Sequence, residues 1–332
     1  MHYLCNMFYQ CTDIKAKMNE AGSSKTPFLF GINYEMDEGF FVLNPLQQQD
    51  ILFDFNGVSN IKNEENAIPK FSFSATPEDF QTYQKRFETV MNGLRSGDSR
   101  LVNLTIKTPV QSSLSLRDIF TYSRTMYRLY LPQKFVCFSP EIFVKIENGK
   151  IYTYPMKGTI DAGIENAAEV ILNDPKETAE HRDSVDLLCN DLSEIATNVN
   201  VKRFRYIDRL KTSKGEILQV SSEIEGTLPE NYLLTLGSLL FKLLPGGSIA
   251  GAPKETSLNI IREAEQEPRG YYTGIAGYFD GKTLDTCVLI RFIEQQNDAL
   301  FFRSGGGITI NSICEKEYRE AIRKVYLPFQ SV

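Results

Sequence analysis

Residues 154–160 read YPMKGTI and residues 176–191 read KETAEHRDSVDLLCND, with a polar connector between the two segments. The pair Asp174-Pro175 is typical of a helix start, because aspartate caps a helix and proline suits its first turn. Apolar residues then recur at helical spacing and predict one buried face: Val185, Leu188, Leu192 and Ile195. The stretch therefore predicts an apolar strand that carries Lys157, followed by a long helix.

Acidic residues spaced three apart occur on this helix and again near the C-terminus. The two pairs are Glu177 with Glu180 and Glu317 with Glu320, and Lys324 follows the second pair by one turn. Carboxylates at this spacing point the same way. A single pair is usually a solvated first turn that the helix dipole favours, but two pairs on distant helices offer the oxygen ligands that Mg²⁺ requires. We therefore predict a magnesium site between the two helices.

Length and composition narrow the class of protein. The chain has 332 residues, of which 42% are hydrophobic and 23% are charged, as in ordinary globular proteins. No linker or repeat is visible, so we expect one continuous unit over residues 1–332. The net charge of −6 argues against nucleic acid as a partner, and no apolar run approaches membrane-spanning length.

Cysteine and histidine counts exclude several kinds of site. The six cysteines include no CxxC pair and no signal peptide is visible, which predicts reduced thiols in a cytoplasmic protein. The chain has two histidines, too few for a histidine-rich metal site, and a Ser-His-Asp triad is nearly excluded. We expect His181 on the helix surface or behind the site.

The order of elements predicts the fold class. Strand and helix patterns alternate irregularly and include hairpins, so we expect an α+β fold, a layered sandwich of large, mostly antiparallel sheets flanked by helices. Aromatic-rich strands over residues 28–57 predict one half-buried sheet at an edge of the structure. We also predict helices over 77–96 and 115–127, a hairpin turning at Glu147–Gly149, and a last strand that breaks at Gly305–Gly307.

Several features allow two interpretations each. Lys157 lies in an apolar strand, where the amine either reaches solvent or is partly buried, and burial favours its uncharged, nucleophilic form. Arg291 ends the apolar run CVLIR and is either a surface residue or a clamp for a carboxylate. The segment GGSIAGAPK, residues 246–254, lacks the GK[ST] of a phosphate loop and is either a tight turn or an anion-binding turn. Gly305–Gly307 forms either a bulge or a close backbone approach to a ligand.

Taken in order, these segments resemble the chorismate-utilising enzymes, which include anthranilate, aminodeoxychorismate, isochorismate and salicylate synthases. The resemblance covers roughly residues 80–328, so residues 1–75 form a poorly matched N-terminal part and residues 76–330 a catalytic core. The segments that carry it are SPE (139–141), PMKGT (155–159), KETAEH (176–181), VDLLCND (185–191), GGSIAGAPK (246–254), RGYYTG (269–274), the IR of CVLIRF (290–291), SGGGI (304–308), EYRE (317–320) and Lys324.

The resemblance implies a role for each matched residue. Glu141 resembles the general acid that protonates the leaving hydroxyl, and Lys157 resembles the lysine that attacks C2 of chorismate in aminodeoxychorismate synthases. The metal ligands of the family correspond to Glu180 and Glu320 directly, and to Glu177 and Glu317 through water. The substrate-binding positions correspond to Thr159, to Tyr272 and Arg291 at the enolpyruvyl carboxylate, and to Gly305, Gly307 and Lys324 at the ring carboxylate with Mg²⁺.

Lys157 is the position that distinguishes members of this family. Anthranilate synthases typically carry a small residue there, and isochorismate-type enzymes use a different lysine, whose position here is Leu101. Leucine cannot act as a base, so hydration of chorismate is disfavoured. Further departures are Gln219, where the family has a histidine, and Ala250, where it has a threonine.

The resemblance therefore implies an amino-transferring enzyme that aminates chorismate at C4, on the way to p-aminobenzoate and folate. Ammonia would come from a separate glutamine amidotransferase subunit, since no glutaminase module is evident in this chain. Two alternatives remain at this stage: anthranilate synthase component I, and a non-catalytic chorismate-binding homologue.

Overall fold

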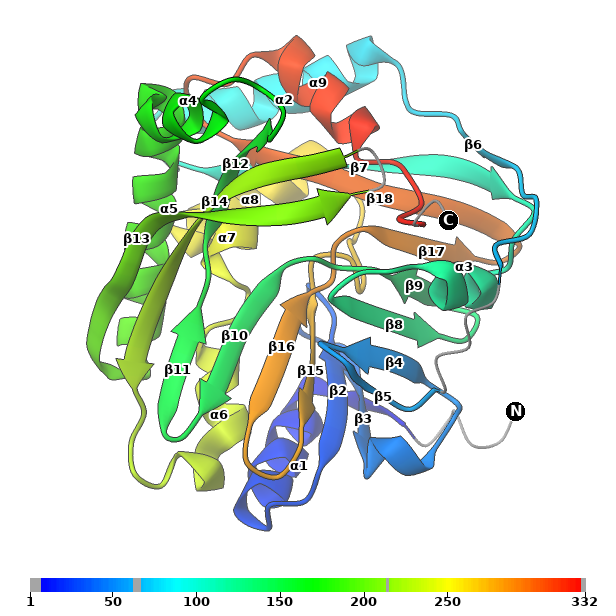
Figure 1. Ribbon diagram of the computed structural model, residues 1–332, viewed down its shortest axis with the longest axis vertical. Coiled ribbons are helices and arrows are strands. Elements are labelled where there is room, and N and C mark those ends of the chain that lie inside the picture. Colours follow the sequence, from blue (N-terminus) through cyan, green and yellow to red (C-terminus); the bar gives the residue numbers. More distant parts are fainter. Residues whose placement is uncertain (1–6, 62–66, 213–214, 330–332) are drawn as a thin grey trace.

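The computed structural model describes residues 7–61, 67–212 and 215–329, which form two large β-sheets with helices on their outer faces (Figure 1). The first sheet has ten strands, with β13 (Thr197–Thr212) beside β14 and the others in the order β1 (Phe8–Gln10), β3 (Glu38–Leu43), β2 (Phe28–Ile32), β15 (Ile275–Phe279), β16 (Leu284–Val288), β10 (Ile142–Glu147), β11 (Lys150–Thr153), β14 (Gly215–Thr227) and β12 (Met156–Asp161). The second sheet has eight, in the order β5 (Val58–Ser59), β4 (Leu52–Phe55), β8 (Tyr127–Leu131), β9 (Phe135–Cys137), β17 (Phe292–Gln296), β18 (Ala299–Ile308), β7 (Val102–Ser112) and β6 (Phe73–Ala75).

Every pairing between these described strands is antiparallel, so the predicted α+β class with antiparallel sheets is confirmed. The α-helices of the described chain are α1 (Cys11–Ser23), α2 (Phe80–Arg95), α3 (Leu116–Tyr122), α4 (Ala167–Asn173), α5 (Pro175–Ser193), α6 (Leu236–Lys242), α7 (Gly247–Ala250), α8 (Lys254–Glu265) and α9 (Cys314–Arg323). Short 3₁₀ turns lie at η2 (Pro45–Gln47) and η3 (Tyr232–Thr235).

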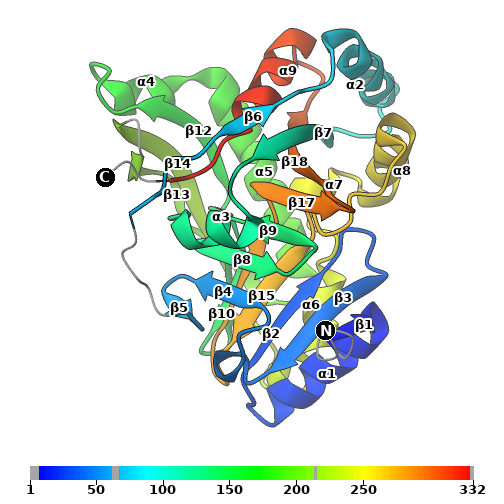
Figure 2. The same ribbon diagram turned by 90° about the vertical axis from the view of Figure 1, so that its right-hand side faces the viewer.

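Strand β2 shows how the layers arise. Leu29 belongs to the apolar cluster between the two sheets, whereas Phe28 and Phe30 belong to the cluster on the opposite face, which α1 and α6 cover. Successive side chains of a strand point to opposite faces, so one strand supplies two cores. On the outer face of the second sheet, α2, α8 and α9 pack against Val102 and Leu104 of β7 (Figure 2). The order of layers is therefore helices, sheet, sheet, helices.

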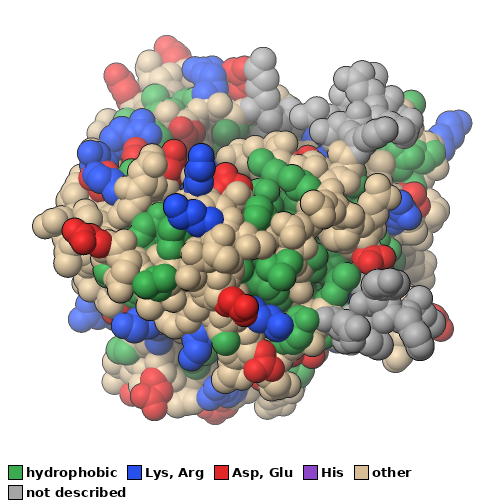
Figure 3. All heavy atoms as spheres, turned by 90° about the horizontal axis from the view of Figure 1, so that it is seen from below, with side chains coloured by type: hydrophobic (Ala, Val, Ile, Leu, Met, Phe, Trp, Pro, Cys, Tyr) green, Lys and Arg blue, Asp and Glu red, His purple; other side chains and the backbone are tan. Residues whose placement is uncertain are grey.

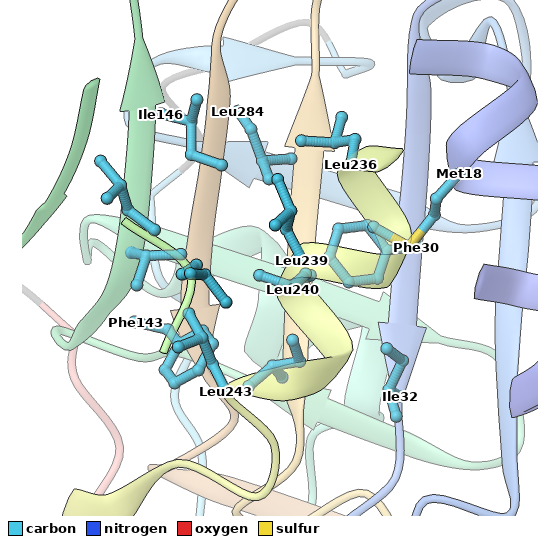
Figure 4. Close-up of a cluster of buried hydrophobic side chains, with 14 of the residues drawn as sticks. Met18, Phe30, Ile32, Phe143, Ile146, Leu236, Leu239, Leu240, Leu243 and Leu284 are labelled. Carbon is cyan, nitrogen blue, oxygen red and sulfur yellow. The ribbon is translucent and has the colours of Figure 1, made fainter. Parts of the chain in front are cut away.

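The stretch Tyr232–Ala250, which contains α6, is long and apolar enough to cross a membrane by length and composition alone. This finding corrects the expectation that no apolar run approaches that length. In the structure the stretch consists of three short helices, η3, α6 and α7, and half of it is buried. Leu239 and Leu240 of α6, and Leu243 just after it, belong to the same buried cluster as Phe143 of the first sheet (Figure 4). Each buried leucine contributes about 1.5–3 kcal/mol, so α6 works as a core helix here.

Three local predictions were wrong. The helix expected over 115–127 ends at Tyr122, and Tyr127 begins β8 instead. The last strand does not break at its glycines, since β18 continues through Gly305–Gly307. The strands expected in one sheet over residues 28–57 divide between both sheets, because β2 and β3 pair with β15 while β4 pairs with β8.

The outer surface is mixed in character. On the face shown in Figure 3, basic and acidic side chains lie interspersed, so this face presents no strip of one charge.

The helix predicted over 77–96 forms as α2, but Phe80 at its start is 36% exposed rather than part of the buried side.

Candidate active site

One cavity of about 360 Å³ lies where strands from both sheets meet α5, α7 and α9. Its volume lies within the range of small-molecule sites, and polar and charged side chains line it together with apolar ones. Most of the site residues predicted from the sequence line this cavity together: Glu141, Lys157, Thr159, Tyr272, Arg291, Gly305, Gly307, Glu320 and Lys324. The fold thus gathers residues from distant parts of the chain at one place.

The first wall of the cavity, which we call the α5 wall, consists of β12 and α5. Two residues of β12, Lys157 and Gly158, oppose a single residue of β14, which makes a β-bulge. Gly158 has a φ of +80°, and a Cβ at this position would lie 2.9 Å from Oε2 of Glu177. The glycine therefore permits both the bulge and the close approach of α5. The Lys157 amine lines the cavity and has no hydrogen bond or ion pair within the described residues.

Helix α5 is held in place at both ends. The Asp174 carboxylate accepts a hydrogen bond from the Glu177 amide at 2.9 Å, which confirms the predicted cap. Near the other end, Asp191 pairs with Lys254 at 3.0 Å and accepts from the Gly247 amide at 3.0 Å. One amide of the GGSIAGAPK segment is therefore used inside the protein, to tie the segment to α5.

His181 lies inside the molecule and not on the helix surface. It is fully buried, and its Nε2 is 2.7 Å from the Ser222 hydroxyl of β14. Burial, assisted by the charges of Arg205 and Lys157, lowers the pKa of His181 to about 4. The imidazole is therefore neutral at physiological pH and fastens α5 to the first sheet.

The second wall of the cavity, which we call the α9 wall, consists of β18 and α9. Gly306 faces this wall, since a Cβ there would make ordinary contacts at 3.5 Å with the Lys324 amine and 3.8 Å with Oε1 of Glu320. Lys324 Nζ donates to the Gly305 carbonyl at 2.7 Å and pairs with Glu320 at 2.7 Å. The lysine of this wall is thus tied to both the strand and the helix.

Glu141 and Arg291 lie on two crossings of the chain between the sheets. Strand β9 leads to β10 through Glu141, and β16 leads to β17 through Arg291. The crossings run side by side, because the Phe138 amide donates to the Arg291 carbonyl at 3.0 Å and the Val288 amide donates to the Glu141 carbonyl at 3.1 Å. This pairing brings an acid and an arginine into the same cavity.

The environment of these two residues suits a reaction on an anion. Burial raises the pKa of Glu141, although Lys157, Arg291 and Lys324 act to lower it. A carboxyl with a raised pKa is a better proton donor near neutral pH. The Nε atom of Arg291 is buried and lacks a hydrogen-bond partner among the described residues. An unpaired buried N–H is costly, so a ligand carboxylate is a suitable partner for it.

Tyr272 and Thr159 complete the predicted substrate-binding set. Burial raises the pKa of Tyr272 to about 12, so its hydroxyl stays protonated and can donate. Thr159 lies opposite Gln219 in the register of β12 and β14, and both residues line the cavity.

The four glutamates of the predicted magnesium site differ in environment. Burial raises the pKa of Glu177, with a further contribution from Glu180. Burial also raises the pKa of Glu317, where a hydrogen bond with Ser312 opposes the shift and Glu320 adds to it. Burial acts to raise the pKa of Glu320 as well, but Lys324 holds it below the usual value.

These carboxylates are close in space without forming a complete metal site. Among the described residues, no three His, Cys, Asp or Glu side chains converge to hold an ion. Lysines partner two of them instead: Lys176 lies 3.6 Å from Glu180, and Lys324 lies 2.7 Å from Glu320. Mutual repulsion in the cluster fits a cation, and each lysine lies next to one oxygen of its carboxylate, Oε1 in both pairs.

The sequence matches the chorismate-binding enzyme family over residues 43–329. The chain belongs to this family. It is 48% identical over 315 residues to a protein of Haemophilus influenzae described as an uncharacterized PabA-like protein, covering 94% of this chain and 95% of the relative. It is 30% identical to aminodeoxychorismate synthase component 1 of Bacillus subtilis, over 76% of this chain and 56% of that one. It is 36% identical to anthranilate synthase component 1 of Aquifex aeolicus, over 60% of this chain and 41% of that one.

Solved structures of chorismate-binding enzymes share the fold. Anthranilate synthase component I from Streptococcus pneumoniae superposes with a TM-score of 0.67 at 28% identity, over 79% of this chain and 60% of that one. The relatives that are named as synthases extend well beyond the matched region. Their names point to two different products, aminodeoxychorismate and anthranilate. The comparisons therefore show the family but do not distinguish between the two products.

Two of the three departures from the pattern of chorismate-binding enzymes lie at the cavity. Leu101 lines it, and a Cβ at Gly307 would lie 2.9 Å from Leu101 Cδ1 and 3.8 Å from the Lys157 amine. An apolar side chain thus occupies the region beside that amine. Gln219 also lines the cavity, whereas Ala250 is fully buried in α7 and does not line it.

Two further cavity residues were missed by sequence reasoning. Asn103 lines the cavity, and its Oδ1 is buried without a hydrogen-bond partner among the described residues. Thr273 also lines the cavity and has a φ of +61°. The polar position in the run VNL was a usable signal for Asn103, since alternation in a buried strand marks one polar face. Nothing in the sequence indicated the left-handed backbone of Thr273.

Proposed function

We propose that this chain is the chorismate-aminating component of an aminodeoxychorismate synthase. The observation that carries the proposal is the unpaired amine of Lys157, which faces the same cavity as Arg291 and Lys324. Two cationic side chains suit the two carboxylates of chorismate, and a free amine beside them suits nucleophilic attack on the ring.

In this proposal the residues divide the reaction between them. The Lys157 nitrogen bonds to C2 of chorismate, the two ring double bonds shift, and the C4–O bond breaks. Glu141 gives its proton to the departing hydroxyl, which leaves as water, and its raised pKa supports that role. Ammonia then bonds to C4, the double bonds shift back, and the bond between C2 and Lys157 breaks. Tyr272 and Arg291 would orient the enolpyruvyl carboxylate.

Mg²⁺ belongs to the proposal through the two acidic pairs. Glu180 and Glu320 would bind it directly, with Glu177 and Glu317 through water. The ion would supply positive charge for the ring carboxylate next to Lys324. Burial is the main reason why the pKa values of Glu177 and Glu317 are raised, and the repulsion from neighbouring glutamates that adds to it supports a cation at this place.

Product analysis tests the proposal. The chain is incubated with chorismate, Mg²⁺ and an ammonium salt, and the products are separated and identified by mass spectrometry. We expect 4-amino-4-deoxychorismate, which a lyase converts to p-aminobenzoate. Fluorescent anthranilate as the main product would identify an anthranilate synthase instead, a function favoured by the 36% identity to the Aquifex aeolicus enzyme. Addition of a glutamine amidotransferase subunit with glutamine in place of ammonium tests the proposed partner.

A further inference from the structure

Arg205 of β13 has no part in the proposed reaction, yet its guanidinium is bound to two helices beside the active site. Its Nη1 donates to the Leu172 carbonyl at 2.8 Å and to the Thr178 hydroxyl at 2.6 Å. Its Nη2 donates to the Ile171 carbonyl at 3.0 Å. Arg205 forms no ion pair within the described residues, so hydrogen bonds to neutral oxygens of α4 and α5 hold this charge in place.

These bonds join the end of one helix to the start of the next. Ile171 and Leu172 belong to the last turn of α4, where carbonyls lack partners within the helix. Thr178 lies in the first turn of α5, directly after Glu177 and two residues before Glu180. In Figure 1, α4 lies at the upper end of α5, near β12. One side chain thus fixes how α5 leaves α4, and a change there would move both carboxylates.

Ile171 also connects Arg205 to the bulge that carries Lys157. The buried Ile171 side chain packs on this bulge, since a Cβ at Gly158 would lie 3.3 Å from Ile171 Cδ1. The carbonyl of the same residue accepts from Nη2 of Arg205. The guanidinium therefore reaches each functional part of the α5 wall through one intervening residue, Ile171 for the bulge and Thr178 for the acidic pair.

The protein accepts local costs to hold Arg205 in this orientation. Phe204 and Arg205 together oppose Ser222 of β14 in a β-bulge, and the φ of Arg205 is +51°, in the left-handed region that favours glycine. The Arg205 amide donates to the Ser222 hydroxyl, which also lies 2.7 Å from Nε2 of His181. Nε of Arg205 is buried without a partner among the described residues. Backbone strain and an unpaired donor together call for an explanation.

We propose that Arg205 is a positioning residue, which holds the Lys157 bulge and the acidic pair of α5 in one fixed arrangement. Arg205 does not line the active-site cavity, so it acts through the residues that it binds. This inference rests on the proposed function, because it assigns Arg205 a role through Lys157 and through the two glutamates. Loss of the guanidinium should therefore impair both parts of the α5 wall together.

Two measurements on Arg205→Gln in the full chain test this role. Intact mass follows the rate of Lys157 adduct formation with chorismate, saturating Mg²⁺ and no ammonia. Mn²⁺ serves as the metal probe, and electron paramagnetic resonance gives its Kd in the presence of chorismate. Arg209→Gln is the matched control, because Arg209 lies on the same strand and pairs with Glu216 at the protein surface at 2.9 Å. Thr178→Val removes the hydroxyl that links Arg205 to α5 and leaves Ile171 in place.

We expect Arg205→Gln to slow adduct formation by about 10- to 100-fold and to raise the Kd for Mn²⁺ by about tenfold, because small displacements of reacting groups are costly. Thr178→Val should raise the Kd for Mn²⁺ but leave the adduct rate within about twofold of wild type, because the contact of Ile171 with the bulge remains. Arg209→Gln should match wild type in both measurements.

A folded Arg205→Gln with both values unchanged, even if less stable to denaturant, would reduce Arg205 to a structural residue and overturn the proposal. The proposed function would then stay in place. If Arg205→Gln does not fold, Thr178→Val decides, and Mn²⁺ binding equal to that of wild type would overturn the proposal. A wild type that forms no adduct and binds no Mn²⁺ would overturn the proposed function itself, and this result is visible before any variant is made.

Discussion

The α5 wall and the α9 wall of the cavity contain the same kinds of residues but connect them differently. Each wall has a lysine, a glycine-containing strand and a Glu-x-x-Glu helix. Lys157 of the α5 wall has no hydrogen bond or ion pair among the described residues. Lys324 of the α9 wall is tied to Gly305 and Glu320, both at 2.7 Å. The difference teaches that an amine without partners is suited to form a bond with a ligand. An amine that is held by hydrogen bonds is suited to keep a positive charge at one place.

The largest expected effect is on the free lysine. Lys157→Ala should lower kcat for amination by on the order of 10³-fold, because the covalent route is lost, while chorismate binding changes little. Rates of product formation and a chorismate Kd test this. Intact-mass analysis of wild type with chorismate and no ammonia should show an adduct on Lys157. Lys282→Ala, at an exposed turn, is the control. Near-normal amination by Lys157→Ala without any wild-type adduct would assign Lys157 to a binding role.

The second-largest expected effect is on magnesium binding, because the proposed site takes carboxylate ligands from both walls. Glu180→Gln on one wall and Glu320→Gln on the other should each reduce Mg²⁺-dependent turnover by about 10²-fold or more, since each removes an anionic ligand of a hard cation. A Mg²⁺ titration of activity, with a chelator blank, measures the effect. Glu315→Gln on the same helix α9 is the control, as it pairs only with Arg319. If a chelator left the activity of wild type unchanged, magnesium would have no part in the proposed function.

The tethered lysine should behave differently from the free one. Lys324→Met should raise KM for chorismate by roughly 10- to 100-fold, because a carboxylate partner is lost, and it should still form the Lys157 adduct at high chorismate. It also removes the cation that lowers the pKa of Glu320, so the acidic limb of the pH–rate profile should move to higher pH. Steady-state kinetics across pH test both effects. Loss of adduct formation at saturating chorismate would mean that the two lysines act as one unit.

The glycine of the α5 wall should matter for stability. Gly158→Ala should lower the free energy of unfolding by about 2–4 kcal/mol, because the backbone has a positive φ and the new methyl group meets the Glu177 carboxylate. Gly149→Ala separates the two causes, since Gly149 has a similar φ and no atom nearby. Denaturant unfolding measures both variants. Equal losses would mean that the approach of α5 contributes nothing.

The smallest expected effect is the pH dependence that His181 gives to the α5 wall. Its pKa is about 4 in the folded protein and near 6.5 when unfolded, so the unfolded chain binds more protons as the pH falls. Between pH 6.5 and 5, wild type should therefore lose roughly 1–2 kcal/mol more stability than His181→Gln. Denaturant unfolding at several pH values gives this difference. Parallel curves for the two proteins would exclude a neutral buried imidazole.

The sequence predicted the strongly periodic elements well, and the reasons lie in particular residues. The cap at Asp174 and the apolar spacing after it defined α5, because both signals are local. Local signals failed where a distant partner decides the structure. Gly305–Gly307 resembles a break in isolation, but pairing with β7 keeps β18 continuous. For His181 the sequence left two places open, the helix surface or behind the site, and the hydrogen bond with Ser222 from a distant strand excludes the surface.

The same contrast between local signals and distant partners applies to the candidate site. Most of the site residues that the order of motifs predicted line the cavity, since a family pattern records long-range contacts that propensity does not. Asn103 was missed although the polar position in VNL was a usable signal, and Thr273 was missed because nothing local indicates its left-handed backbone. The pairing of Lys176 with Glu180 was not foreseen, although the two residues lie four apart on α5, whereas Lys324 was already noted one turn after Glu320.

The paired crossings at Glu141 and Arg291 have a mechanical consequence. Any movement of one sheet relative to the other would bend the backbone at these crossings, so the acid and the arginine lie where such a movement would pivot. A ligand carboxylate on Arg291 then acts as a brace across that pivot. In the proposed function, filling the cavity would therefore also stiffen the contact between the sheets, and the substrate would form part of the frame that holds the reacting groups in place.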